Sequence, residues 1–94
     1  MTATGIVNER KVKVTNPLGV HARPAAMLVQ TAAKFKSEIW FSKDGHEVNG
    51  KSMLGVMTLA AEMGSTVTIR ADGPDEEKAI EALVRVFEMR FGEA

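Results

Sequence analysis

Four short segments of this chain alternate between apolar and polar residues, and this period of two limits its fold more than any other feature. The segments are residues 10–15, 37–43, 46–49 and 65–71. Each has one apolar and one polar face, which is typical of an antiparallel sheet that is covered on one side only. Asp44 and Gly45 predict a two-residue type I′ turn between the second and third strands.

Three other segments carry apolar residues at helical spacing. They are residues 22–34, a short stretch 52–59, and a last helix in which Pro74 takes the first turn, three acids follow and Gly92 marks the end. The order β-α-β-β-α-β-α predicts an α+β open-faced sandwich, in which three helices cover one face of a four-stranded antiparallel sheet. The expected core is Val12, Val14, Leu28, Ala32, Ile39, Phe41, Val48, Val56, Leu59, Val67, Ile69, Leu83 and Phe87.

The bulk properties predict one small domain. Of the 94 residues, 1–8 are expected to form a flexible tail and 9–94 a single domain. Twelve basic side chains balance twelve acidic ones, so nothing indicates binding to nucleic acid or to an anionic membrane. The absence of cysteine excludes disulfides and thiolate metal sites. With no signal peptide and no long apolar run, we expect a soluble cytoplasmic protein, and nothing suggests more than a monomer.

The stretch from Gly19 to Pro24 carries the main chemical signal. A strand here gives way to a helix, and Pro24 fits the first turn because it needs no hydrogen-bond acceptor. His21 falls at or beside the N-cap, with Ala22 and Arg23 in the first turn. Free backbone N–H groups and the helix dipole favour an anion there, a neutral histidine is a nucleophile, and a guanidinium suits phosphate. The stretch predicts a site where histidine meets phosphate, although a solvated loop histidine would explain it equally well.

A second candidate lies at the short helix. Ser52 is a natural N-cap, and capping alone explains it, yet the same position would also favour a phosphate. Met53, Leu54 and Met57 are large apolar residues on a helix too short to bury every side, and Met27 lies off the buried stripe of its own helix. These methionines and the leucine are either core residues or an adaptable docking surface.

Other motifs are weaker. Residues 45–52 match the phosphate-loop pattern G-x-x-x-x-G-K-[ST], but a hairpin turn and a strand occupy the place where a cradle of N–H groups is needed. His46 has no second ligand at metal spacing, so no metal and no other cofactor is expected. Trp40 beside Arg70 on the polar sheet face is poor evidence for base stacking.

Two of these stretches together resemble a known family. Residues 19–26 look like the active-site signature of the HPr family, the histidine phosphocarriers of the bacterial phosphotransferase system. Residues 49–59 are similar to the regulatory serine segment of that family, at the matching separation. The resemblance extends to the helix start at residues 73–77 and covers nearly the whole chain after the tail.

The resemblance implies a carrier rather than an independent enzyme. His21 would accept a phosphoryl group from enzyme I and pass it to IIA domains for sugar uptake, with the Ala22 N–H and Arg23 holding the phosphate and Pro24 setting the helix entry. Ser52 would match the serine that HPr kinase/phosphorylase modifies in some bacteria. Met27, Met53, Leu54 and Met57 would match the surface on which partners dock.

One residue departs from the pattern of many sugar-system carriers, which have a hydroxyl residue in place of Leu18. An apolar residue there also occurs in NPr, the carrier of the nitrogen-regulatory branch, whereas the segment around Ser52 favours the kinase-regulated type. The alternatives are therefore an NPr-type carrier and a purely regulatory module of the same fold. The presence of His21 argues against the regulatory module, since regulatory relatives can do without it.

Overall fold

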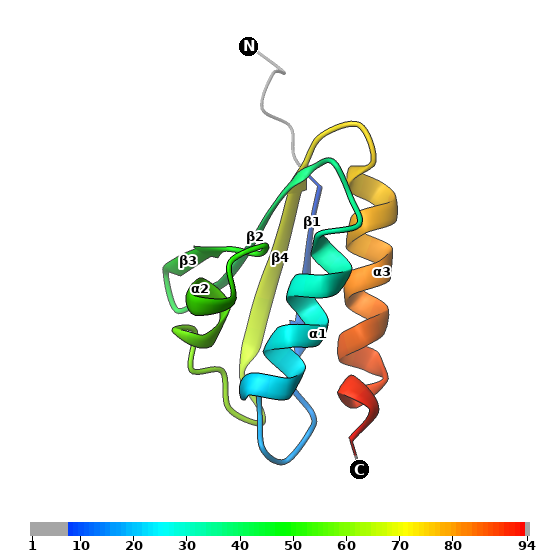
Figure 1. Cartoon of the computed structure of the whole chain (residues 1–94). Coiled ribbons are helices and arrows are strands. Elements are labelled where there is room, and N and C mark those ends of the chain that lie inside the picture. The colour runs from blue at the N-terminus through cyan, green and yellow to red at the C-terminus, as the bar shows by residue number, and fades with distance from the viewer. Residues whose placement is uncertain (1–7, 94) are drawn as a thin grey trace.

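The computed structural model describes residues 8–93, and in this range the predicted order of elements and the α+β class are confirmed (Figure 1). The predicted tail falls outside the described residues except for Asn8. The strands are β1 (Asn8–Lys13), β2 (Glu38–Lys43), β3 (His46–Asn49) and β4 (Thr66–Asp72), and the helices are α1 (Ala22–Ala32), α2 (Met53–Met57) and α3 (Glu76–Glu88), followed by a 3₁₀ turn (Arg90–Gly92).

The four strands form one antiparallel sheet in the order β1-β4-β2-β3. The long helices α1 and α3 lie side by side on one face of this sheet, and α2 lies beside α1 near β3 (Figure 1). Asp44 and Gly45 have φ angles of 51° and 84°, so both central residues of the β2–β3 turn have the positive φ that the predicted type I′ turn requires.

The core lies between the sheet and the helices. All thirteen predicted core residues belong to it; twelve are buried, and Val12 at the edge of the sheet is half-buried. Phe87 of α3 packs edge-to-face on Phe41 of β2 and on Phe91, at ring-centroid distances of 6.4 and 5.0 Å. Phe91 is buried although its φ is 55°, so the chain bends back sharply just after α3 and buries this ring. The bend determines where the residues after it lie.

The start of the last helix differs from the prediction. Pro74 precedes α3 instead of occupying its first turn, and Asp75 is the N-cap residue. The Asp75 carboxylate does not cap its own helix; it accepts hydrogen bonds from the backbone N–H groups of Lys36 and Ser37 and from the Ser37 hydroxyl, at 2.6–3.0 Å. The acid therefore joins the α1–β2 connection to the start of α3.

Several other boundaries also differ from the predicted ones by a few residues, including the start of β1 and the end of α3. β1 begins at Asn8, whose side-chain amide donates to Glu76 at 3.1 Å, so this residue belongs to the domain. α3 ends at Glu88, and Gly92 ends the separate 3₁₀ turn. Within residues 8–93 no helix is both long and apolar enough to span a membrane.

Candidate functional site

The loop before α1 is fixed by close backbone contacts. Gly19 has a φ of +68°, and a Cβ at this position would lie 2.4 Å from the carbonyl oxygen of Ala61. The next N–H, that of Val20, donates to the same Ala61 oxygen at 2.8 Å. His21 follows as the N-cap residue of α1 in extended conformation, and its side chain makes no capping hydrogen bond. Its imidazole is therefore available for other contacts.

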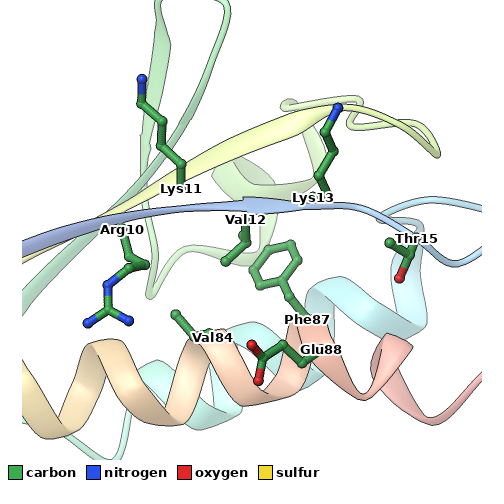
Figure 2. A pocket seen from close by; sticks show the side chains of 8 residues that line it. All are labelled: Arg10, Lys11, Val12, Lys13, Thr15, Val84, Phe87 and Glu88. Carbon is green, nitrogen blue, oxygen red and sulfur yellow. The ribbon is translucent and has the colours of Figure 1, made fainter.

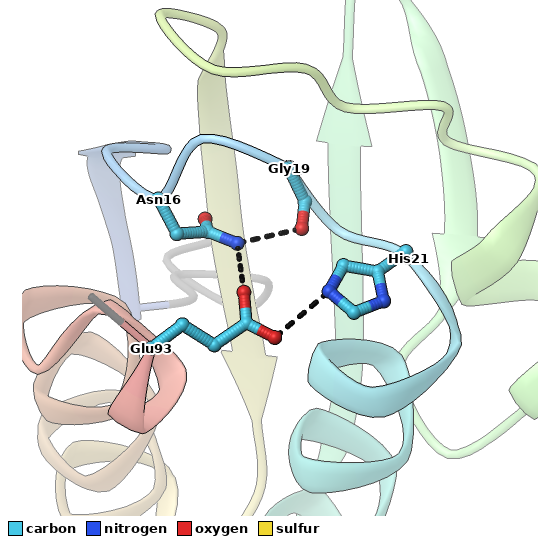
Figure 3. Close-up of polar contacts among 4 residues, drawn as sticks. All are labelled: Asn16, Gly19, His21 and Glu93. Atoms are coloured by element: carbon cyan, nitrogen blue, oxygen red, sulfur yellow. Dashed lines mark hydrogen bonds and ion pairs between the residues drawn. The ribbon is translucent and has the colours of Figure 1, made fainter.

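That imidazole contacts a carboxylate from the other end of the chain (Figure 3). Its Nε2 lies 2.8 Å from Oε2 of Glu93. The second oxygen of this carboxylate, Oε1, accepts a hydrogen bond of 2.8 Å from the Asn16 side-chain amide, which also donates to the Gly19 carbonyl at 2.8 Å. Asn16 is completely buried. One buried amide thus links the loop, the C-terminal segment and the histidine.

The surroundings of Glu93 favour its ionised form. The hydrogen bond from Asn16 is the main reason why the pKa of Glu93 is lowered; the hydrogen bond from His21 and the charges of His21 and Arg23 add to it, and desolvation opposes it. An ionised carboxylate only accepts hydrogen bonds, so the proton between Glu93 and His21 belongs to Nε2. In the neutral ring the lone pair is then on Nδ1.

The free ring nitrogen faces the start of the helix. Figure 3 shows Nδ1 of His21 on the side of the ring away from Glu93, towards the first turn of α1. N–H groups of a first helical turn have no acceptor within the helix and favour an anion. Arg23 lies in this turn, is exposed, and is close enough for its charge to act on Glu93. The arrangement combines a nucleophilic nitrogen with donors for an anion beside it.

The other residues predicted for this site lie where the sequence placed them. Ala22 is the first residue of α1 and is exposed, and Pro24 is buried in the first turn. His21, Ala22 and Arg23 are therefore consecutive around one helix start, with Pro24 fixing the backbone below them.

Ser52 is the N-cap residue of α2, and its Oγ accepts a hydrogen bond from the N–H of Gly55 at 3.0 Å. The capping interpretation is confirmed. On the same helix, Leu54 and Met57 are 81% and 43% exposed, whereas Met53 is half-buried against the core. Met27 on α1 is also half-buried against the core. The predicted docking surface is thus most apolar and most exposed on α2.

The weaker motifs have structural explanations. Residues 46–49 form β3, so the phosphate-loop pattern does not form a loop, in agreement with the sequence analysis. His46 Nε2 lies 3.1 Å from the hydroxyl of Thr58, and residues 8–93 contain no cluster of potential metal ligands. Trp40 lies on the polar sheet face, with the Arg70 guanidinium 4.7 Å from its ring centroid.

Glu93 and Asn16 are the two site residues that sequence reasoning missed. The sequence offers one local signal for Asn16, because an asparagine before Pro17 is typical of a turn. Its need for hydrogen-bond partners follows from the structure, in which Asn16 is completely buried. Glu93 lies 72 residues from His21, in a segment without recognisable pattern. Only the bend at Phe91 brings it to the start of α1.

Comparison with known proteins identifies the type of molecule. Residues 8–89 match the family model described as "PTS HPr component phosphorylation site". The phosphocarrier protein HPr of Xylella fastidiosa is 52% identical over 85 residues, which cover 90% of this chain and 96% of the relative. The HPr-like protein Crh of Halalkalibacterium halodurans is 49% identical over 80 residues, covering 85% of this chain and 95% of that protein.

Solved structures of HPr and Crh proteins have the same fold as this chain. HPr from Thermoanaerobacter tengcongensis superposes with a TM-score of 0.89 at 49% identity, covering 93% of this chain and 98% of that one. A Bacillus subtilis Crh structure, described as a domain-swapped dimer, has a TM-score of 0.72 at 43% identity, with 86% and 93% of the two chains covered. Both carriers and Crh-type proteins therefore share this fold.

Proposed function

This chain belongs to the HPr family of the phosphotransferase system, and we propose that it carries a phosphoryl group on Nδ1 of His21. The observation that carries the proposal is the position of the imidazole. It stands at a helix start with Nε2 engaged by Glu93 and Nδ1 free beside the first-turn N–H groups. One nitrogen is thus held as a donor and the other is left as the nucleophile.

The transfer step follows from this geometry. The Nδ1 lone pair of neutral His21 forms a bond to phosphorus as the bond to the donor atom of phosphorylated enzyme I breaks, and that electron pair leaves with the donor. The Glu93 carboxylate stabilises the positive charge that develops on the ring, as a carboxylate does for a catalytic histidine. The Ala22 N–H and the Arg23 guanidinium hold the phosphoryl oxygens. Protonation of Nδ1 removes the lone pair, so uptake falls on acidification.

Partner proteins supply the remaining chemistry. We expect enzyme I as donor and IIA domains as acceptors, meeting a monomeric carrier in the cytoplasm. The exposed side chains of Leu54 and Met57 on α2, together with the half-buried Met53 on α2 and Met27 on the neighbouring α1, provide an apolar surface. The segment after α2 contacts the loop before His21 through the hydrogen bond from the Val20 N–H to the Ala61 carbonyl oxygen. Because α2 also packs beside α1, we expect a partner that binds α2 to reach the histidine.

Ser52 is proposed as a regulatory phosphorylation site for HPr kinase/phosphorylase. Ser52 is half-buried, and its hydroxyl oxygen caps the start of the helix that bears Leu54 and Met57. A phosphate there would find the N–H groups of the helix start and would add negative charge to an apolar surface. The presence of His21 favours a carrier over a Crh-type regulatory module. The alternative is an NPr-type carrier, which would use the same histidine with the partner proteins of the nitrogen-regulatory branch.

Incubation with phosphoenolpyruvate and enzyme I tests the carrier role. Intact mass should rise by one phosphate, and brief acid treatment should remove it, because a phosphoramidate is acid-labile. The variant His21→Ala should keep its fold but gain no phosphate, whereas His46→Ala should be phosphorylated to the same extent as the parent. Labelling of the His21→Ala variant would refute the assignment. Incubation with ATP and the kinase should instead give an acid-stable phosphate that Ser52→Ala abolishes.

A further inference from the structure

The outer edge of β1 lies outside the proposed function. The strand order places β1 at one end of the sheet, and within residues 8–93 it pairs with β4 alone. The backbone N–H and C=O groups of its other side therefore face away from the sheet. Such an edge can accept a further strand unless something covers it.

A groove runs beside this edge (Figure 2). It has a volume of about 470 Å³ and lies between β1 and α3. Its apolar lining consists of Val12 from β1 and Val84 and Phe87 from α3, of which Val12 and Val84 are half-buried. The edge is thus next to a hollow with room for an apolar side chain.

The charges along the edge are mainly positive, although the chain as a whole is neutral: β1 carries three cations, Arg10, Lys11 and Lys13, and one exposed acid, Glu9. Arg10, Lys11 and Lys13 are exposed, and within the part of the chain described neither Arg10 nor Lys11 forms an ion pair. Lys13 makes one long hydrogen bond, 3.4 Å, to the Gly64 carbonyl. Figure 2 shows Arg10 and Val12 on the α3 side of β1 and both lysines on the opposite side. Glu88 is the acidic residue that lines the groove.

The same charges argue against a second copy of this chain as the occupant. A second copy of β1 would bring three cations and only one acid, Glu9, beside an edge that already has an excess of positive charge, so the net charge opposes edge-to-edge pairing of identical molecules. The same net charge does not oppose an acidic strand. The edge is therefore selective for partners of opposite charge.

We propose that the outer edge of β1 binds an extended acidic segment of a partner protein by strand addition. Acidic side chains of the added strand would lie beside Lys11 and Lys13 on the open face of the sheet. Alternate apolar side chains would enter the groove between Val12 and Val84, with backbone hydrogen bonds holding the strand in register.

Titration of the ¹⁵N-labelled full chain with a short capped peptide of alternating glutamate and valine tests the proposal. Shifts should be confined to β1 and the facing side of α3, outer-edge amides of β1 should gain protection from exchange, and added salt should weaken binding. The double variant Lys11→Glu/Lys13→Glu should weaken it by about tenfold or more. The control variant Lys34→Glu/Lys78→Glu, at two exposed positions elsewhere, should not weaken peptide binding. Neither double variant should change the phosphorylation of His21 by enzyme I.

Three results would overturn the proposal. A peptide with lysine in place of each glutamate could bind equally well, which would mean that charge does not select the occupant. The glutamate peptide could cause no shifts in β1. Sedimentation of the parent chain could reveal a dimer in which the outer-edge amides of β1 are protected from exchange without any peptide, which would assign the edge to a second copy.

Discussion

At the scale of single residues, Glu93 engages one nitrogen of His21, Nε2, and leaves Nδ1 free. The Glu93 side chain is 15% exposed; one carboxylate oxygen lies 2.8 Å from Nε2, and the other accepts a hydrogen bond from Asn16. A carboxylate that is held in place orients an imidazole and selects its tautomer without taking part in bond making. Glu93 is thus a positioning residue for the phosphoryl transfer that we propose.

Replacing Glu93 with glutamine should slow phosphoryl uptake from enzyme I by about tenfold. This factor corresponds to the loss of one charge-assisted hydrogen bond. The ¹⁵N shifts of the His21 ring should at the same time show a mixture of tautomers. Glu62 is exposed, so Glu62→Gln is the matched control and should match the parent in both measurements. A single unchanged tautomer in Glu93→Gln would show that Glu93 does not orient the ring.

At the scale of elements, Asp75 connects the α1–β2 loop to the start of α3. Its three hydrogen bonds, led by that from the Ser37 hydroxyl, lower the pKa of Asp75 from 3.8 to about 2. Because the pKa is lower in the folded state, the stabilisation is complete above the unfolded value of 3.8 and is lost as the pH falls towards 2. Helix and loop are therefore held together least well in acid.

The variant Asp75→Asn should lower the free energy of unfolding at pH 7, because an amide group offers a donor where N–H groups need an acceptor. The deficit relative to the parent should shrink as the pH is lowered through the interval from 3.8 to about 2. Urea unfolding at several pH values measures this. Asp72→Asn at an exposed position is the control, and a deficit for Asp75→Asn that stays constant with pH would contradict the account of this carboxylate.

Ser52 allows capping and regulation to be separated. Ser52→Ala should cost about 1 kcal/mol of stability, the typical value of an N-cap, and should leave phosphorylation of His21 unchanged. Ser52→Asp keeps a capping residue but adds charge beside Leu54 and Met57, so it should keep stability and slow uptake from enzyme I. Equal uptake by both variants would speak against a regulatory role for charge at this position.

At the scale of the whole molecule, alternation and helical spacing were sufficient to predict the fold. Strands with one polar face leave few arrangements for the helices, so the class, the order of elements and the core followed from local pattern. Helix ends were less predictable, because Asp75 forms its bonds to residues 36 and 37 rather than to its own helix. His21 and Arg23 could be placed at the start of α1 from the sequence, since a helix start is a local feature.

The missing half of the site depends on tertiary structure. Glu93 reaches His21 only because Phe91 adopts a left-handed conformation and packs on Phe87, and no short motif encodes that path. Asn16 could be recognised as a turn residue, but its role became visible only with Glu93 in place. Local sequence thus predicts the proposed nucleophile, and the fold brings to it the carboxylate that we propose orients it.

The most direct measurement is the position of the phosphate on the ring. The chain should be labelled with ¹⁵N in its histidines, phosphorylated by phosphoenolpyruvate and enzyme I, and examined for coupling between ¹⁵N and ³¹P. We predict coupling at Nδ1 of His21, with Nε2 still protonated beside Glu93. Coupling at Nε2, or a phosphate on any residue other than His21, would contradict the proposed carrier site.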